Sequence, residues 1–245
     1  MLMLGTIVNV ATILAGGAAG LILKKVLSKS ITDTVMQGVA LAVIIIGISG
    51  ALGAAFTVAG GKVSSEHILF MIIALAVGAL IGELIKIEDR LDAFAKFCES
   101  KFVKPGGTST FAQGFVTATL VFCVGSMAIV GSLEDGISKN SNTLFAKSAL
   151  DGITAMIFAS TMGVGVLFSA ASVGIYHGLI TMLAVFVAPY FSDVVITQIS
   201  LIGSVLIMSI GLNMLNITKI KVGNLLPAIF MPIAYHILQR ILGLF

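Results

Sequence analysis

The sequence is poor in charged residues and contains no tryptophan. Asp, Glu, Lys and Arg make up 10% of the 245 residues, whereas soluble domains carry about 25%. So few charges cannot cover the surface of a soluble domain, and 58% of the residues are hydrophobic, with a mean hydropathy of +1.14. The composition therefore predicts an integral membrane protein. The net charge of +3 gives no reason to expect nucleic acid as a partner.

Cysteine and histidine are also scarce. The two cysteines, Cys98 and Cys123, lie in different surroundings and form no recognisable pair, and the sequence has no C-x-x-C or His/Cys cluster. A structural metal, a disulfide framework and a bound cofactor are therefore not expected. The three histidines occur without an H-E-x-x-H or G-x-S-x-G motif, so the sequence does not predict an enzyme.

Long apolar runs fill most of the chain. A membrane-spanning helix needs about 20 apolar residues, and eight stretches qualify: about 2–23, 34–57, 67–87, 111–133, 151–171, 173–191, 195–217 and 222–243. Between Gly152 and Ser192 there is no charged residue, which is too long for one crossing, so a tight turn is expected at Phe168–Gly174. The predicted architecture is one all-α membrane domain over residues 1–245, a polytopic bundle of about eight transmembrane helices with 2–23 as a retained first span.

Lysine and arginine predict the orientation, because they prefer cytoplasmic loops. Ten of the 14 follow the first, third and seventh predicted spans, which end on the same side of an eight-span bundle. Lys62, Lys139 and Lys147 fall in the opposite loops, and Arg240 near the last span is a minor discord. The bias predicts a multi-pass protein with both termini outside.

The segment 88–102 differs from the spans on either side of it. Its apolar residues recur at helical spacing with charges on the other face: Leu91, Phe94, Ala95, Cys98 and Phe102. This pattern is typical of an amphipathic helix on the cytoplasmic membrane interface. A short soluble helix folded under the bundle fits it as well.

An internal repeat is a further hypothesis. IALAVGALIGELIKI (73–87) and SVLIMSIGLNMLNI (204–217) share a similar rhythm, and each precedes a basic loop. Repeat units 1–135 and 145–245 would then form a parallel 4+4 arrangement. Apolar sequence of low complexity also produces such similarities by chance.

Small residues mark several faces of the predicted helices. Gly16 and Gly20 form a G-x-x-x-G pattern, Gly78 and Gly82 repeat the spacing, and Gly125 extends a small strip along the fourth span. Helices in lipid associate through close backbone approach, which small residues permit. We interpret these glycines as helix-packing positions.

Polar side chains inside the spans are the candidate pathway residues. An amide or hydroxyl in hydrocarbon must find a partner, and the candidates are Asn9, Ser126, Ser132, Ser160, Thr161, Asn213 and Asn224. Asn9, Ser126 and the pair Ser160–Thr161 are each predicted near the middle of a span. Three helices with polar groups at one depth would line a hydrated cavity, although hydrogen bonds between helices explain each residue equally.

The carboxylates lie at span ends rather than at span centres. Asp135 and Asp151 flank the outer ends of the fourth and fifth predicted spans, and Glu83 lies in the last turn of the third, on the cytoplasmic side. Ionisable groups in membrane segments are functional candidates by default, although each could simply face water. Pro227 and Pro232 should kink the last span and expose backbone carbonyls.

Several blocks of the sequence closely resemble the family of bacterial membrane proteins known as domain of unknown function 554 (DUF554), the YdfK/YqgA group. The blocks run in family order over nearly the whole chain: GTIVN, MQGVALAVIIIGIS, GALIGELIKIEDRL, FCVGSMAIVGSLEDG, KSALDGITAMIFAS, GVGVLFSA and IKVGNLLPA. The resemblance implies a protein of the bacterial inner membrane. It supplies no reaction and no catalytic residue.

Three functions remain open from the sequence. Several spans with internal polar residues and kinked helices favour a transporter or channel for a small solute or ion. The G-x-x-x-G faces favour a structural or regulatory membrane protein that assembles with itself or a partner, and a homodimer is expected in either case. A membrane-embedded enzyme would need a nucleophile with its base or clustered metal ligands.

Overall fold

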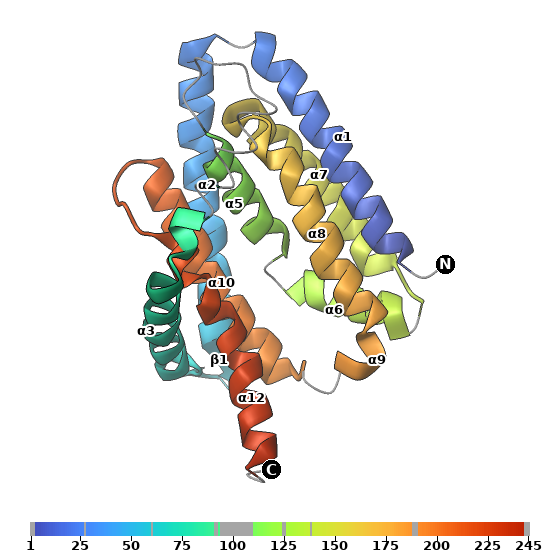
Figure 1. Cartoon of the computed structure of the whole chain (residues 1–245), viewed down its shortest axis with the longest axis vertical. Coiled ribbons are helices and arrows are strands. Elements are labelled where there is room, and N and C mark those ends of the chain that lie inside the picture. The colour runs from blue at the N-terminus through green and yellow to red at the C-terminus, as the bar shows by residue number, and fades with distance from the viewer. Residues whose placement is uncertain are drawn as a thin grey trace.

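The computed structural model describes residues 3–26, 28–59, 61–90, 93, 110–123, 126–137, 139–187 and 191–242. The long helices form a bundle (Figure 1) and include α1 (Leu4–Val26), α2 (Lys29–Ala55), α3 (Ile68–Ile85), α5 (Phe111–Cys123), α6 (Ser126–Ile137), α7 (Asn142–Met162), α8 (Gly165–Met182) and α10 (Asp193–Met214). Shorter elements are α9 (Ala184–Val187), α11 (Val222–Leu225), the 3-10 helix η2 (Leu226–Phe230) and α12 (Met231–Ile241). The predicted class of helical membrane protein is confirmed.

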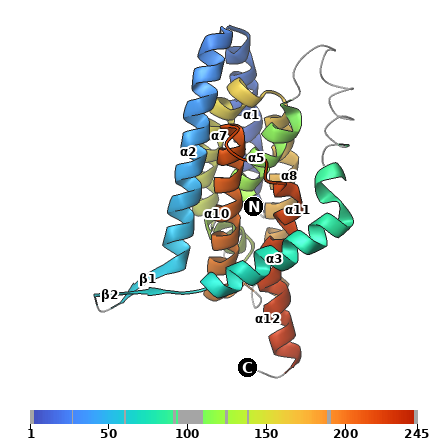
Figure 2. The same cartoon turned by 90° about the vertical axis from the view of Figure 1, so that its left-hand side faces the viewer.

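One short β-hairpin accompanies the helices. Strands β1 (Phe56–Ala59) and β2 (Lys62–Ser65) pair antiparallel, with Phe56 opposite Ser65. The hairpin projects away from the bundle between α2 and α3, as Figure 2 shows.

Six of the described helical segments are long and apolar enough to cross a membrane, and the bent pair α5/α6 would make a seventh. The six are Leu4–Lys24, Asp33–Ala55, Ile68–Ile85, Gly165–Met182, Asp193–Met214 and Val222–Ile241. The count of eight is therefore not confirmed by length and composition. The long helix that is not among these segments is α7, which carries Lys147 and Asp151 in its first half.

The predicted turn at Phe168–Gly174 is wrong, because these residues lie inside α8. The chain turns instead at Gly163, whose φ of +83° is a left-handed conformation that glycine adopts without strain. The predicted fifth span, 151–171, corresponds to α7, which begins at Asn142 rather than at residue 151. The sequence analysis began this span at the charged residue Asp151, but Lys147 and Asp151 neutralise each other inside the helix.

The fourth predicted span, 111–133, is broken. Helix α5 ends at Cys123 and α6 begins at Ser126, and the two parts are bent by 59°. The last span is also irregular, since its two prolines fall in the first turns of η2 and α12. Pro227 and Pro232 thus interrupt the α-helix as predicted, because proline cannot donate a backbone hydrogen bond.

Close backbone contacts hold the helices in pairs. A Cβ atom on Gly16 would collide with the carbonyl oxygen of Gly152, so α1 and α7 meet backbone to backbone. A Cβ on Gly82 would collide with the carbonyl oxygen of Asn224, and Gly78 packs against Ala228. These contacts join α3 to α11 and η2. They are the close approach that lipid-embedded helices use in place of a hydrophobic driving force.

The remaining glycine prediction and the interfacial helix cannot be placed. Gly125 and most of the segment 88–102 lie outside the described residues. The internal repeat also stays a prediction. The apolar core is instead continuous across the bundle, with α1, α2, α5, α7, α8 and α10 all contributing buried side chains.

Candidate functional site

A buried ion pair lies within α7. Lys147 and Asp151, one helical turn apart, are 6% and 5% exposed. The Lys147 Nζ donates to both carboxylate oxygens of Asp151, at 2.8 Å to Oδ1 and 2.7 Å to Oδ2. A buried charge is retained only with a partner, because its removal from water costs several kcal/mol. The i,i+4 spacing supplies that partner within one helix.

Helix α1 adds a third member to this pair. Asn9, which is 0% exposed, donates its side-chain amide to Asp151 Oδ2 at 3.0 Å. The two helices run parallel, since Gly5 lies against Leu144 near both starts and Gly20 against Met156 further along. The backbone contact at Gly16 and Gly152 brings them close enough for this bond.

Other buried polar atoms lie on the helices that pack against α7. His177 of α8 is 0% exposed and acts electrostatically with Lys147. Neither ring nitrogen makes a hydrogen bond of good geometry within the described part of the chain, although the Phe122 carbonyl lies near the ring. Thr6 Oγ1 and Asn9 Oδ1 also lack a partner among the described residues. We call Thr6, Asn9, Lys147, Asp151 and His177 the polar core.

The polar core lies beside the broken span. Cys123, the last residue of α5, is buried and interacts electrostatically with both Lys147 and Asp151. Helix α6 then starts at Ser126 and packs on α7 and α8. The end of α5 and the start of α6 therefore lie next to the buried ion pair.

Towards the start of α7 the buried polar groups continue. Ser141 donates to Asp135 Oδ1 at 2.6 Å, and Asp135 Oδ2 has no hydrogen-bond partner among the described residues. Thr181 of α8 donates to the carbonyl of Ser132 at 3.1 Å. These groups line the end of the bundle at which α6 ends and α7 begins.

A separate polar network lies near the end of α3. Asn224 donates its amide to Glu83 Oε2 at 2.6 Å and accepts from the backbone N–H of Glu88 at 2.8 Å. Lys221 donates to Glu83 Oε1 at 3.0 Å, and the Gly223 N–H donates to Glu88 Oε2 at 2.6 Å. This network fixes the start of α11 against α3. The hydrogen bond and the negative charge of Glu83 raise the pKa of Lys221 above its ordinary value.

The Glu83→Gln variant should lower the pKa of Lys221 towards its ordinary value. The neutral amide removes the negative charge and cannot accept as strongly. NMR titration of the lysine side chain in detergent micelles measures the change, with Glu66→Gln on the hairpin as the control. An unchanged Lys221 titration in Glu83→Gln would contradict this assignment.

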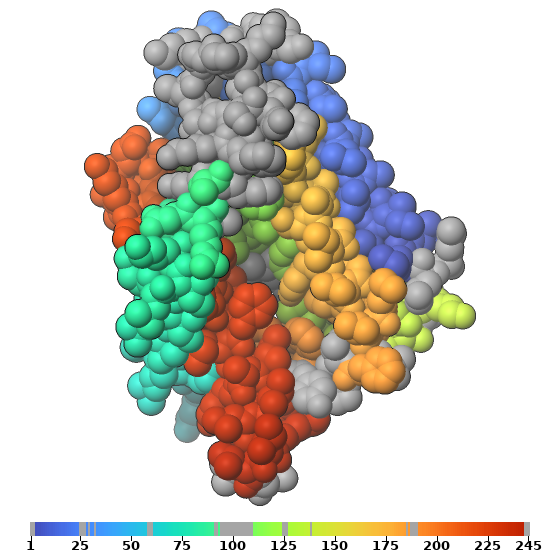
Figure 3. All heavy atoms as spheres, viewed as in Figure 1, coloured from blue at the N-terminus to red at the C-terminus, as the bar shows by residue number. Residues whose placement is uncertain are grey.

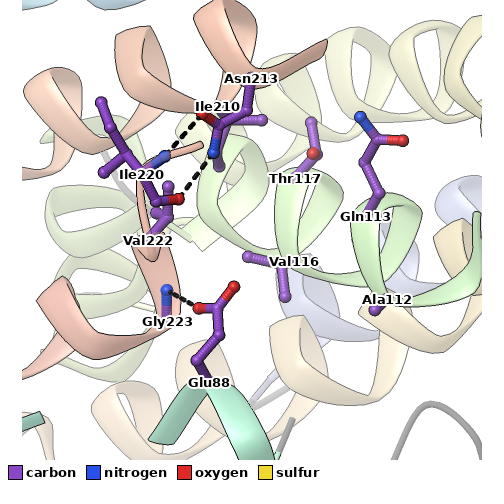
Figure 4. Close-up of a pocket in the computed structure, with 10 residues that line it drawn as sticks. All are labelled: Glu88, Ala112, Gln113, Val116, Thr117, Ile210, Asn213, Ile220, Val222 and Gly223. Carbon is purple, nitrogen blue, oxygen red and sulfur yellow. Dashed lines mark hydrogen bonds between the residues drawn. The ribbon is translucent and has the colours of Figure 1, made fainter. Parts of the chain in front are cut away.

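A pocket of about 280 Å³ lies next to this network, between α5, α10 and the segment that precedes α11. Figure 4 shows its polar lining, Glu88, Gln113, Thr117 and Asn213. The Asn213 side chain is already hydrogen-bonded to the loop before α11: it donates to the Ile220 carbonyl and accepts from the Ile220 N–H. The space-filling view in Figure 3 shows α3 and α12 side by side on this face of the molecule.

The structure brings only some of the predicted pathway residues together. Asn9 and Asp151 meet, whereas Ser160 and Thr161 lie more than two turns further along α7 and bond to carbonyls of that helix. Ser132 likewise bonds to the Ala128 carbonyl. The side chain of Ser126 lies outside the described residues. These residues therefore do not form the expected group of polar side chains from three helices at one depth.

The sequence analysis missed three members of the polar core, Thr6, Lys147 and His177. Lys147 was counted with an outer loop, although its spacing of four from Asp151 is the signal of a helical ion pair. His177 was considered only as one of three histidines outside any catalytic motif, and nothing in its neighbours along the chain connects it to Lys147. Among the described residues, no three His, Cys, Asp or Glu side chains group in a way that could hold a metal ion.

Comparison with known proteins gives a consistent result. The chain is 33% identical over 230 residues to the uncharacterized membrane protein YdfK of Bacillus subtilis (strain 168), covering 94% of each chain. It is 28% identical over 234 residues to the uncharacterized protein YqgA of Escherichia coli (strain K12), again covering 94% of each. No solved structure matches. The model of the family described as "Protein of unknown function (DUF554)" matches residues 4–237, and the chain therefore belongs to the DUF554 family of membrane proteins.

Proposed function

We propose that this protein is a membrane transporter or channel for a small solute or ion, and that its pathway passes the polar core. The observation that carries the proposal is the Lys147–Asp151 pair, buried beside α1 and α8. Replacing a buried ion pair with apolar residues of similar volume is often neutral or stabilising. Stability alone therefore gives little reason for its presence, and ionisable groups inside membrane bundles mark pathways for ions and substrates.

The break between α5 and α6 supports the same proposal. Discontinuous helices in transporters end near the bound substrate, where their free backbone groups contact it. Here the break at Cys123 and Ser126 lies next to the ion pair. A pathway would thus pass charged side chains and two helix ends in one region.

We further propose that the protein lies in the bacterial inner membrane with both termini outside. The support is the excess of Lys and Arg in the loops on one side, which requires α7 to cross the membrane as well, and the bacterial source of both relatives. A protease or fusion-reporter assay at each terminus in intact cells would test the orientation.

The alternative function, assembly with itself or a partner, has lost part of its support. The glycines Gly16, Gly20, Gly78 and Gly82 all contact other helices of the same chain. They are therefore not free for a second protein. A homodimer stays a prediction, testable by mass measurement of the detergent complex.

Asp151→Asn should reduce solute flux by at least about tenfold, a loss of about 1.4 kcal/mol of transition-state stabilisation, because it removes the charge that holds Lys147. Uptake of labelled inorganic ions, carboxylates, amines and amino acids into proteoliposomes measures it, against empty vesicles. Asp33→Asn is the matched control, since Asp33 is exposed near the start of α2. No uptake of any of these solutes by the wild-type protein, or equal uptake by Asp151→Asn, would overturn the proposal.

A further inference from the structure

The charges and donors of the polar core indicate what kind of solute it would bind. We propose that the transported solute is a small anion carried together with a proton, with Lys147 as the anion-binding residue and Asp151 as the proton acceptor. This inference rests on the proposed function and names its substrate class.

The surroundings of Asp151 favour a proton over a metal cation as the species that binds there. Both carboxylate oxygens already accept N–H donors, two from Lys147 and one from Asn9. A metal cation would have to displace the ammonium group and the amide together. A proton needs only one carboxylate oxygen, and it leaves Asn9 able to bond to the other.

Protonation of Asp151 removes the counter-ion of Lys147. The new O–H bond uses a proton from solvent and removes the negative charge, so the ammonium group is left without a counter-ion in a site that is 6% exposed. An uncompensated buried charge is strongly unfavourable. A monovalent anion that accepts from Lys147 Nζ restores neutrality. One proton and one anion therefore enter together, and the core carries no net charge before or after.

The other groups of the polar core suit an anion as well. A neutral imidazole has one N–H donor, and a threonine hydroxyl has one O–H donor. His177 and Thr6 each hold such a group in buried surroundings with no hydrogen bond of good geometry within the described part of the chain, although the Phe122 carbonyl lies near the His177 ring. Helix α6, with its N-terminal end at Ser126 next to Cys123, contributes a positive dipole end. Together these donors could replace the hydration shell of a small anion.

The titratable groups that face Asp151 are few. Helix α7 supplies Lys147, α5 supplies Cys123, and α8 supplies His177 and the neighbouring Tyr176, which interacts with Cys123. Asp135 of α6 lies further towards the end of the bundle and is bonded to Ser141. Helix α1 supplies the non-titratable Asn9, and α2 has no charged residue from 34 to 55. Proton binding at the core is therefore assigned to Asp151 and can be separated from His177 by mutation.

The test measures binding in detergent, without transport. Nitrate and chloride are the probes, because neither binds protons itself, and gluconate serves as the bulky reference anion. Thermal stabilisation gives the apparent affinity, and a pH-indicator dye in weakly buffered solution reports proton uptake. Sodium is exchanged for choline to test for a cation effect.

For the wild-type protein, we expect nitrate or chloride to bind with proton uptake. The apparent affinity should fall by about tenfold for each pH unit above the pH at which Asp151 loses its proton, because binding then requires protonation. Asp151→Asn mimics the protonated acid, so it should bind the anion independently of pH and without proton uptake. Lys147→Met should abolish anion binding. The double variant Lys147→Met/Asp151→Leu, which has no buried charge, should fold and should also bind no anion.

Three results would overturn the inference: anion binding that survives in the double variant, a pH dependence that persists in Asp151→Asn but is lost in His177→Gln, or a response to sodium and choline instead of anions. Solute flux without proton-linked anion binding would overturn this inference alone. Proton-linked anion binding without any flux in proteoliposomes would instead overturn the proposed transport function.

Discussion

Lys147→Met is expected to destabilise the protein by about 3–5 kcal/mol, the cost of breaking a buried ion pair by removing one partner. The methionine fills a similar volume, so the loss comes chiefly from Asp151. Its carboxylate would lose two of its three hydrogen bonds while staying 5% exposed. Equilibrium unfolding in mixed detergent micelles, followed by circular dichroism, measures the change in free energy of unfolding.

The double variant is the control for this prediction. With Asp151→Leu added, neither charge remains, and stability should return to the wild-type value or rise above it, because well-packed apolar residues often replace a buried pair without loss. Lys221→Met in the exposed pair with Glu83 should change stability little, since solvent screens that interaction. A double variant as unstable as Lys147→Met would show that packing at residue 147, and not its charge, stabilises α7.

Gly16→Ala should have the second largest effect, a loss of about 1–3 kcal/mol or more from overpacking. The added methyl group would collide with the carbonyl oxygen of Gly152, a backbone atom that cannot rotate away. Helix α1 would have to move off α7, which would also pull Asn9 away from Asp151. The same unfolding assay measures the loss, and Asn9→Ala reports how much of it comes from the hydrogen bond.

Gly38→Ala in α2 is the matched substitution. No atom lies within 4 Å of the position that its Cβ would take, and the residue is in mid-helix. Alanine is favoured over glycine in a helix by about 0.5–1 kcal/mol, so this variant should be slightly more stable than wild type. If both alanine variants stabilised the protein alike, the backbone contact between α1 and α7 would be excluded.

The prediction from sequence was accurate where a property depends on residues near each other in the chain. Runs of about 20 apolar residues identified five of the six unbroken segments that could cross a membrane, and the prolines of the last span marked its irregular stretch. The G-x-x-x-G spacing selected positions that lie at close helix contacts. It could not name the contacting helix, because the spacing describes one face only.

The errors arose where a local pattern competed with a contact from elsewhere. The charged residue Asp151 was taken as the start of a span. Lys147 and Asp151 instead neutralise each other inside α7, and the helix starts at Asn142. The hydroxyls of Ser160 and Thr161 were expected to face a cavity, but a serine or threonine in a helix can bond to a carbonyl three or four residues earlier. Neither the ion pair nor these hydrogen bonds can be recognised in the hydrophobicity profile of the sequence.

The sequence by itself determined that this chain is a helical membrane protein of the DUF554 family, because hydrophobicity and family blocks are properties of the chain read in order. Only the tertiary structure decided which polar groups form a site. Asn9, Asp151 and His177 come from helices far apart in sequence, and close packing of α1, α7 and α8 brings them to one buried region. In that region water is excluded, so each charge and each donor must be matched by a neighbour, and the function proposed here depends on that match.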